Sequence, residues 1–221
     1  MEEDKDRKPS LGQEMISTLT DENARSLAKD YAELAIDAIS GNELIQAIPV
    51  FGTVFGLARG ALSIHTALWE QKVLKFLSHT DGATEEEWTE FAEKLSNEKG
   101  GTSRAGEALL SHLERLDDSD KARLTGMLYV AAARGELTIS ELKRCCMIID
   151  RVYLDDLDEF AMVVYSAGGG LVEARDAMMF LGSVDRLTNS KVRGGIGPEQ
   201  DEPTSIALKL LHVVSEEGRL R

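Results

Sequence analysis

Residues 44–64, LIQAIPVFGTVFGLARGALSI, form the longest apolar stretch of the chain. Gly52, Gly56 and Gly60 recur in it every four residues, so a helix would place them on one face. Each glycine costs a helix about 1 kcal/mol relative to alanine, and close packing against another helix can offset that cost. The pattern therefore predicts a helix-contact face, or glycine zipper, that packs against a helix of the same chain, a second copy or lipid.

The length of this stretch leaves two interpretations open. A membrane-spanning helix needs about 20 apolar residues. Arg59 interrupts the run, and we expect Pro49 to kink its first half. A buried helix of a bundle needs only about 10 to 15 apolar residues. We therefore expect a buried helix, and the alternative is a membrane-associating effector that inserts or oligomerises through residues 44–64.

The composition favours a helical, acidic protein. The 221 residues include four prolines and 5% aromatic residues, while Ala, Leu, Glu and Lys are abundant. Lys and Arg number 25 against 39 Asp and Glu, which gives a formal net charge of −14. This charge argues against broad electrostatic attraction to nucleic acid or to anionic lipid.

The N-terminal residues and the cysteines lead us to expect a cytoplasmic location. Residues 1–10, MEEDKDRKPS, are charged and lack the apolar segment of a secretory signal. Cys145 and Cys146 are adjacent, and side chains one position apart on a helix diverge by about 100°, so we expect no ordinary bridge between them. No Cys or His spacing typical of a zinc site is present.

Three segments follow from the polarity pattern. Residues 1–20 are predicted to form a mobile polar arm. Apolar residues then recur at helical spacing, which predicts a helical bundle domain over residues 21–155. A change of pattern after Asp155 marks a small C-terminal subdomain over residues 156–221. The fold class expected is mainly α, with an α/β or winged-helix-like tail.

About six helices are expected in the bundle domain. Capping boxes predict the starts of two of them, with Thr84 paired with Glu87 and Thr138 paired with Glu141. The expected helices run from Asp21 to Ser40, through the glycine-rich stretch to Leu77, from Thr84 to near Gly100, over about 103–116, from the acidic start at 117–120 to Gly135, and over about 139–154.

The tail has the order of elements that ends a winged-helix fold. A helix over residues 173–186 is followed by a polar loop that carries Lys191 and Arg193, and residues 205–221 then form a strand or short helix. The helix itself has two arginines against three acidic residues, whereas a DNA-reading helix normally carries a basic surface. We therefore expect protein contact from this tail. The alternative is a DNA-binding regulator with Lys191 and Arg193 as wing contacts.

The sequence contains none of the familiar catalytic motifs. The glycines of residues 168–176, GGGLVEARD, lack the GK[ST] of a phosphate-binding loop and the spacing of a dinucleotide-binding fingerprint. The four histidines are widely separated, and neither HExxH nor GxSxG occurs. We therefore expect no catalytic residue, no cofactor and no bound metal.

Four phrases occur in order over about residues 45–160: IPVFGTVFGLARGALSI, KVLKFL, LDDSDKARLTGMLYVAAARGELTISELKR and IIDRVYLDDL. Their succession resembles a group of uncharacterised prokaryotic and prophage helical proteins, which share phrases of the form IPVxG, LKFL, LDDxxKAxLxG and IDRxxLxDL. The resemblance implies a helical fold and a prokaryotic or prophage source. It carries over no functional residue.

These observations together predict a non-enzymatic interaction or regulatory protein of a prokaryotic accessory system, such as phage defence. It would act through helical packing contacts with a protein partner or with a second copy of itself.

Overall fold

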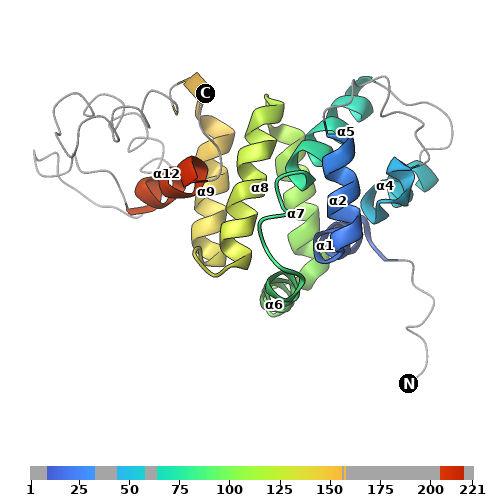
Figure 1. The fold of residues 1–221 in the computed structure, drawn as a ribbon, viewed down its shortest axis with the longest axis horizontal. Coiled ribbons are helices and arrows are strands. Elements are labelled where there is room, and N and C mark those ends of the chain that lie inside the picture. Colours follow the sequence, from blue (N-terminus) through green and yellow to red (C-terminus); the bar gives the residue numbers. More distant parts are fainter. Residues whose placement is uncertain (1–8, 33–43, 58–63, 156, 158–204, 217–221) are drawn as a thin grey trace, which may run out of the picture. The chain divides into compact units, whose positions relative to one another are not determined.

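The computed structural model describes residues 9–32, 44–57, 64–155, 157 and 205–216, and all regular elements in this part are helices (Figure 1). The chain divides into two compact units, Met1–Gly126 and Met127–Arg221. The division falls within a helix, whereas the sequence placed a soft boundary near residue 155.

The described helices of the first unit begin and end as follows: α1 Leu11–Thr20, α2 Glu22–Tyr31, the 3-10 turn η1 Ile45–Ala47, α4 Pro49–Leu57, α5 Ile64–Leu77, α6 Glu85–Ser96 and α7 Gly101–Arg115. Helix α8, Ser119–Ala133, contains the division. The second unit continues with α9, Ile139–Arg151, and α12, Ser205–Glu216. The mainly α fold class is thereby confirmed for the described part of the chain.

Helix α1 corrects the prediction that residues 1–20 form a mobile polar arm. The Ser10 side chain accepts a hydrogen bond from the Gln13 backbone N–H, and the Gln13 side chain accepts one from the Ser10 N–H. This capping box starts the helix. Met15 and Leu19 are completely or almost completely buried. The second half of the supposed arm therefore belongs to the core.

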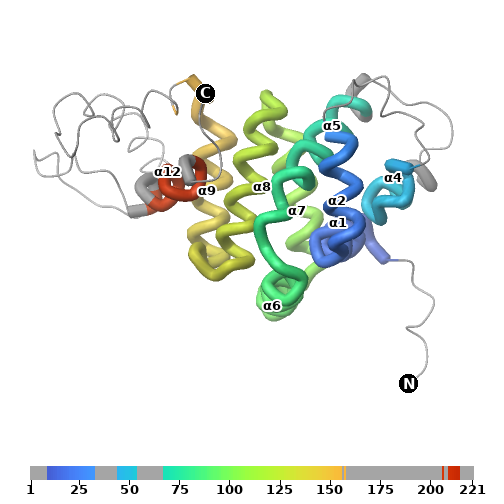
Figure 2. Tube along the Cα trace, in the orientation of Figure 1, coloured from blue at the N-terminus to red at the C-terminus, as the bar shows by residue number. Residues whose placement is uncertain are grey.

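Helices α1 and α7 are neighbours (Figure 2), and two glycines bring their main chains into contact. A Cβ atom on Gly106 would lie 2.0 Å from the carbonyl oxygen of Gly12, and one on Gly12 would lie 2.0 Å from that of Ser103. Only glycine fits at either position, because real Cβ contacts are never this short. The hydroxyls of Ser10 and Ser103 lie 2.6 Å apart beside this crossing and share a hydrogen bond.

Helix α1 also supports the start of α4. The buried Thr18 hydroxyl donates to the Glu14 carbonyl oxygen at 2.8 Å and accepts from the Val50 backbone N–H at 3.2 Å. Val50 lies in the first turn of α4, where N–H groups have no partner within the helix. Thr18 therefore satisfies one of these donors from a neighbouring helix.

The glycine-rich stretch does not form one helix over residues 44–64. Ile48 has extended backbone (ψ 123°) between η1 and α4, and α4 begins at Pro49. Proline at the first helical position lacks only an N–H that would be unpaired in any case, so it starts this helix and does not kink one.

The predicted glycine face is only partly within the described structure. Gly52 and Gly56 lie in α4, and Gly60 lies outside the described residues. A Cβ on Gly52 would meet the carbonyl oxygen of Gln46 at 2.9 Å, in the turn that precedes α4. A contact face over Gly52, Gly56 and Gly60 stays a prediction. None of the described helices combines the length and the apolar character needed to cross a membrane.

Both predicted capping boxes are confirmed. Thr84 and Glu87 exchange side chain to backbone hydrogen bonds at the start of α6, and Thr138 and Glu141 do so at the start of α9. The largest fully buried side chains lie in the first unit: Trp88, Phe51, Phe76, Phe91, Met15, Leu19, Ile45, Ile48, Leu74 and Leu77.

In the second unit, α12 packs against α9 (Figure 2). Ile206 and Leu210 of α12 are buried, and the Lys209 ammonium lies 2.6 Å from a carboxylate oxygen of Glu141. The closing segment is thus a helix over Ser205–Glu216. The expected wing with Lys191 and Arg193 lies outside the described residues.

Gly106→Ala tests the crossing of α1 and α7. Helix propensity alone would stabilise this variant by about 1 kcal/mol, but the new Cβ would collide with the Gly12 main chain, and we expect a net loss of about 2 kcal/mol. Urea unfolding measures the difference. Ala108→Gly, at an exposed site of α7, calibrates the propensity effect at about 1 kcal/mol. Unchanged or increased stability of Gly106→Ala would contradict the crossing.

Lys209→Gln tests the packing of α12 on α9. The hydrogen bond from Lys209, followed by those from Thr138, lowers the pKa of Glu141 from 4.5 to about 2. Without Lys209 the pKa should rise but stay below 4.5, because the capping box remains. An NMR titration of the Glu141 carboxyl measures this shift. Lys143→Gln is the control, because it makes the same charge change in α9, the helix that contains Glu141. An unaltered Glu141 pKa in Lys209→Gln would show that the pair does not form.

Candidate binding pocket

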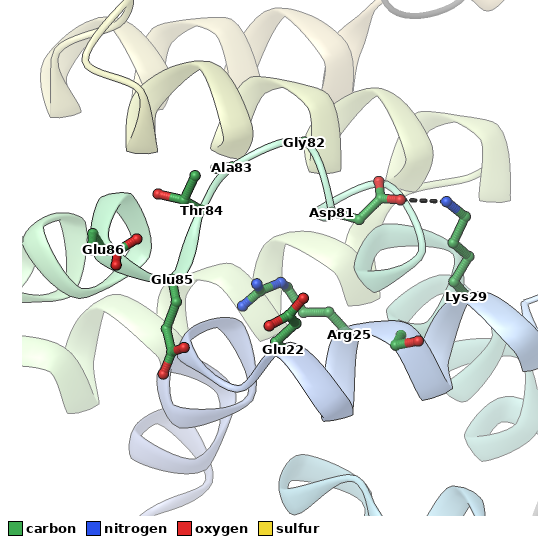
Figure 3. A pocket seen from close by; sticks show the side chains of 10 residues that line it. Glu22, Arg25, Lys29, Asp81, Gly82, Ala83, Thr84, Glu85 and Glu86 are labelled. Carbon is green, nitrogen blue, oxygen red and sulfur yellow. Dashed lines mark hydrogen bonds and ion pairs between the residues drawn. The ribbon is translucent and has the colours of Figure 1, made fainter.

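A pocket of about 650 Å³ lies in the first unit, between the start of α2 and the loop that leads into α6 (Figure 3). Two helix N-termini meet there, because α2 begins at Glu22 and α6 at Glu85. The pocket is lined by Glu22, Arg25, Ser26, Lys29, Asp81, Gly82, Ala83, Thr84, Glu85 and Glu86.

Arg25 forms the floor of this pocket and is only 4% exposed. Its Nη1 donates a hydrogen bond to the Leu19 carbonyl oxygen at the end of α1. Its Nε has no hydrogen-bond partner among the described residues. Burial lowers the pKa of Arg25, and nearby carboxylates, Glu22 first, oppose this effect. Since arginine ionises far above neutral pH, Arg25 remains a cation.

Trp88 holds the Arg25 guanidinium from below. The guanidinium carbon lies 5.8 Å from the centre of the Trp88 ring, within the range of a cation–π interaction. Trp88 is fully buried, donates from Nε1 to the Thr80 carbonyl oxygen at 3.2 Å, and packs edge-to-face on Phe91. The floor of the pocket is therefore fixed by side chains that cannot move without disturbing the core.

Exposed carboxylates form the rim. Glu22 is the first residue of α2, and Glu85 and Glu86 are the first two of α6. A helix N-terminus stabilises negative charge in its first turn. Asp21 and Thr84 already cap the two helix ends through their own side chains, so the rim carboxylates are not needed as caps.

An ion pair closes one side of the pocket. The Lys29 ammonium of α2 contacts the Asp81 carboxylate of the loop (Figure 3). The hydrogen bond that Lys29 donates to Asp81, with the attraction of the carboxylate charge, raises the pKa of Lys29. Both side chains are about half exposed, so the pair contributes little to stability. It does neutralise one charge of each sign.

Glu70 of α5 is a second unusual group, away from the pocket lining. Its residue is 0% exposed, and neither carboxylate oxygen has a hydrogen-bond partner within the described part of the chain. It shares a helix face with the buried Ala67, Val73 and Leu74. Burial raises the pKa of Glu70 above 4.5, because an apolar environment disfavours the ionised form.

The thiol of Cys146 lies in α9, the imidazole of His112 in α7 and that of His79 just after α5, so these three groups come from different parts of the fold. Burial raises the pKa of the Cys146 thiol, which disfavours the nucleophilic thiolate. His112 lies 3.4 Å from the Thr125 hydroxyl inside the first unit, and burial lowers the pKa of His79. No group of three His, Cys, Asp or Glu side chains in this part of the chain is placed to hold a metal ion.

The pocket contains none of the contact residues that the sequence singled out, although Thr84, predicted as a helix cap, lines it. Gly52 and Gly56 lie in α4, and Gly60, Lys191 and Arg193 lie outside the described residues. The acidic residues of the rim look like ordinary helix starts in the sequence. Their run after the Thr84 capping box marks the start of α6, but no sequence signal marks a buried arginine beneath them.

No protein-family model, no curated protein and no solved structure matches this chain. The function is therefore inferred from the geometry of the chain itself.

Glu70→Gln tests whether the buried carboxyl is protonated in the folded state. A group whose pKa is raised on folding contributes stability below its unfolded pKa, here about 4.5, and loses it as pH rises through the folded value. Glutamine has the shape of the protonated acid and no charge. We expect the variant to be more stable than the natural protein at about pH 8, with a gap that narrows toward about pH 5.

Urea unfolding at the two pH values measures this gap. Glu90→Gln is the control, because it makes the same change at an exposed residue of α6. A Glu70→Gln variant that is less stable than the natural protein at the higher pH would show that the carboxylate is ionised and satisfied.

Proposed function

We propose that the protein is a non-enzymatic interaction module and that it holds a protein partner at the pocket between α2 and α6. The observation that supports this most strongly is Arg25, a cation that is only 4% exposed and still lines a solvent-facing pocket. Burying a charged donor without its hydrogen bonds costs free energy. A bound partner that supplies an acceptor would offset that cost.

The side chains of the pocket suit binding better than catalysis. Arginine does not release its proton near neutral pH, so Arg25 cannot serve as a general acid or base. Its position is fixed by Leu19 and Trp88, which leaves it preorganised for a ligand before the ligand arrives. The rim carboxylates are exposed and add charge selectivity around this fixed donor.

We also propose the finer assignments that the sequence suggests. These are a cytoplasmic protein of a prokaryotic accessory system, with a winged-helix-like C-terminal subdomain used for protein contact. The resemblance of the four ordered phrases supports the source. The helical α12, packed on α9, supports an ordered segment over Ser205–Glu216 in this subdomain.

A photo-crosslinking amino acid at Ser26 tests the pocket as the binding surface. Ser26 is exposed and lines the pocket, whereas Ser111 is exposed on α7 and serves as the matched control site. In the native cells, irradiation should give a discrete protein adduct from position 26 and none from position 111. Adducts from both positions alike, or from neither, would contradict the proposed function.

A further inference from the structure

We infer that the pocket receives a lysine or arginine side chain from a basic segment of the partner, while a main-chain carbonyl oxygen of that segment accepts a hydrogen bond from Arg25. This inference rests on the proposed function and adds the chemistry of the partner to it.

The charge of the lining favours a cation. Four carboxylates and two cations line the pocket, and the pair of Lys29 with Asp81 removes one charge of each sign. Glu22, Glu85 and Glu86 then outnumber the single guanidinium of Arg25 in the lining. A surplus of negative charge at the rim attracts a positive group and repels a free anion. The overall charge of −14 acts in the same direction at longer range.

The floor of the pocket offers hydrogen-bond donors to an acceptor. Arg25 has five N–H donors. One on Nη1 bonds to the Leu19 carbonyl oxygen, and the one on Nε is enclosed by the protein, so a ligand would bond to the donors that remain on Nη1 and Nη2. A carboxylate or phosphate acceptor would have to pass the acidic rim. A peptide carbonyl oxygen carries no net charge, so it can reach the guanidinium without that penalty. A basic peptide supplies both groups, the cation for the rim and the neutral acceptor for the floor.

The size of the pocket fits this occupant. A volume of about 650 Å³ lies inside the range of about 300–1,000 Å³ in which proteins bind small ligands. It accommodates a long side chain together with a short length of its backbone. The ten lining residues come from one side of α2 and from one loop with the start of α6, so a segment can enter from solvent without any rearrangement of the helices (Figure 3).

The binding test uses four probes with the full chain: the blocked peptide acetyl-Gly-Lys-Arg-Lys-Gly-amide, the same peptide with three glutamates, the triamine spermidine, and inorganic phosphate. Isothermal titration calorimetry at low salt gives each affinity. We expect the basic peptide to bind most tightly, about tenfold better than spermidine, because spermidine has the charge but no carbonyl oxygen. Added salt should weaken peptide binding.

Two triple variants with equal charge change locate the binding site. Glu22→Gln, Glu85→Gln and Glu86→Gln together remove the rim carboxylates, and Glu90→Gln, Glu93→Gln and Glu114→Gln together remove three exposed carboxylates elsewhere. We expect the first set to weaken the basic peptide about tenfold and the second by less than about twofold. Circular dichroism checks that both sets stay folded.

Arg25→Met tests the acceptor part of the inference. In this variant the advantage of the basic peptide over spermidine should disappear, since the guanidinium donor is gone. Arg25→Lys should restore part of it in a folded protein, because one charged donor returns.

Three results would overturn the inference: tighter binding of phosphate or the glutamate peptide, equal losses in the two triple variants, or equal affinity for the basic peptide and spermidine in the natural protein. If the Ser26 adduct forms and the basic peptide does not bind, the inference fails while the proposed function stands. If the Ser26 adduct is absent, the proposed function itself fails.

Discussion

The main-chain contact between Gly12 and Gly106 is the constraint on which the rest of the first unit depends. It sets how close α1 comes to α7, and α4, α2 and α6 also pack against α1. Any side chain at the crossing would push α1 outward and move every neighbour with it. The free-energy cost of two helical glycines is offset by close packing and by the shared hydrogen bond between Ser10 and Ser103.

The geometry of the pocket depends on this crossing, because the crossing positions the end of α1. The end of α1 provides the Leu19 carbonyl oxygen that holds Arg25, and Trp88 of α6 provides the ring beneath it. The starts of α2 and α6 then place their first-turn carboxylates in the lining of the pocket. A buried cation beneath an acidic rim is thus a direct consequence of how three short helices meet, and it gives the surface both a fixed hydrogen-bond donor and a preference for positive charge.

Local signals predicted part of this structure. The capping boxes at Thr84 and Thr138 located the starts of α6 and α9, because a cap is a property of four consecutive residues. Helix α1 was missed because two of its buried residues are Gly12 and Thr18, which do not count as apolar in a periodicity search. Its capping box at Ser10 was the signal available.

The contact face and the site could not be read from the sequence for a different reason. The regular glycine spacing over residues 44–64 drew attention to that stretch, whereas Gly12 and Gly106 meet only through the fold. Arg25 likewise looks like an ordinary charged residue of a helix until Trp88 and the end of α1 cover it. Tertiary contacts of this kind have no local pattern, so only the structure brings these residues together.

The central claim, that α1 crosses α7 in main-chain contact, is most directly tested by disulfide trapping. The double variant Ser10→Cys with Ser103→Cys is compared with the control Ser10→Cys with Ser111→Cys. Both are mildly oxidised, and peptide mapping of the unreduced digest identifies the cysteines that have joined. A disulfide that joins positions 10 and 103, with none between 10 and 111, is the predicted result, and failure of the first pair to join would contradict the crossing of α1 and α7.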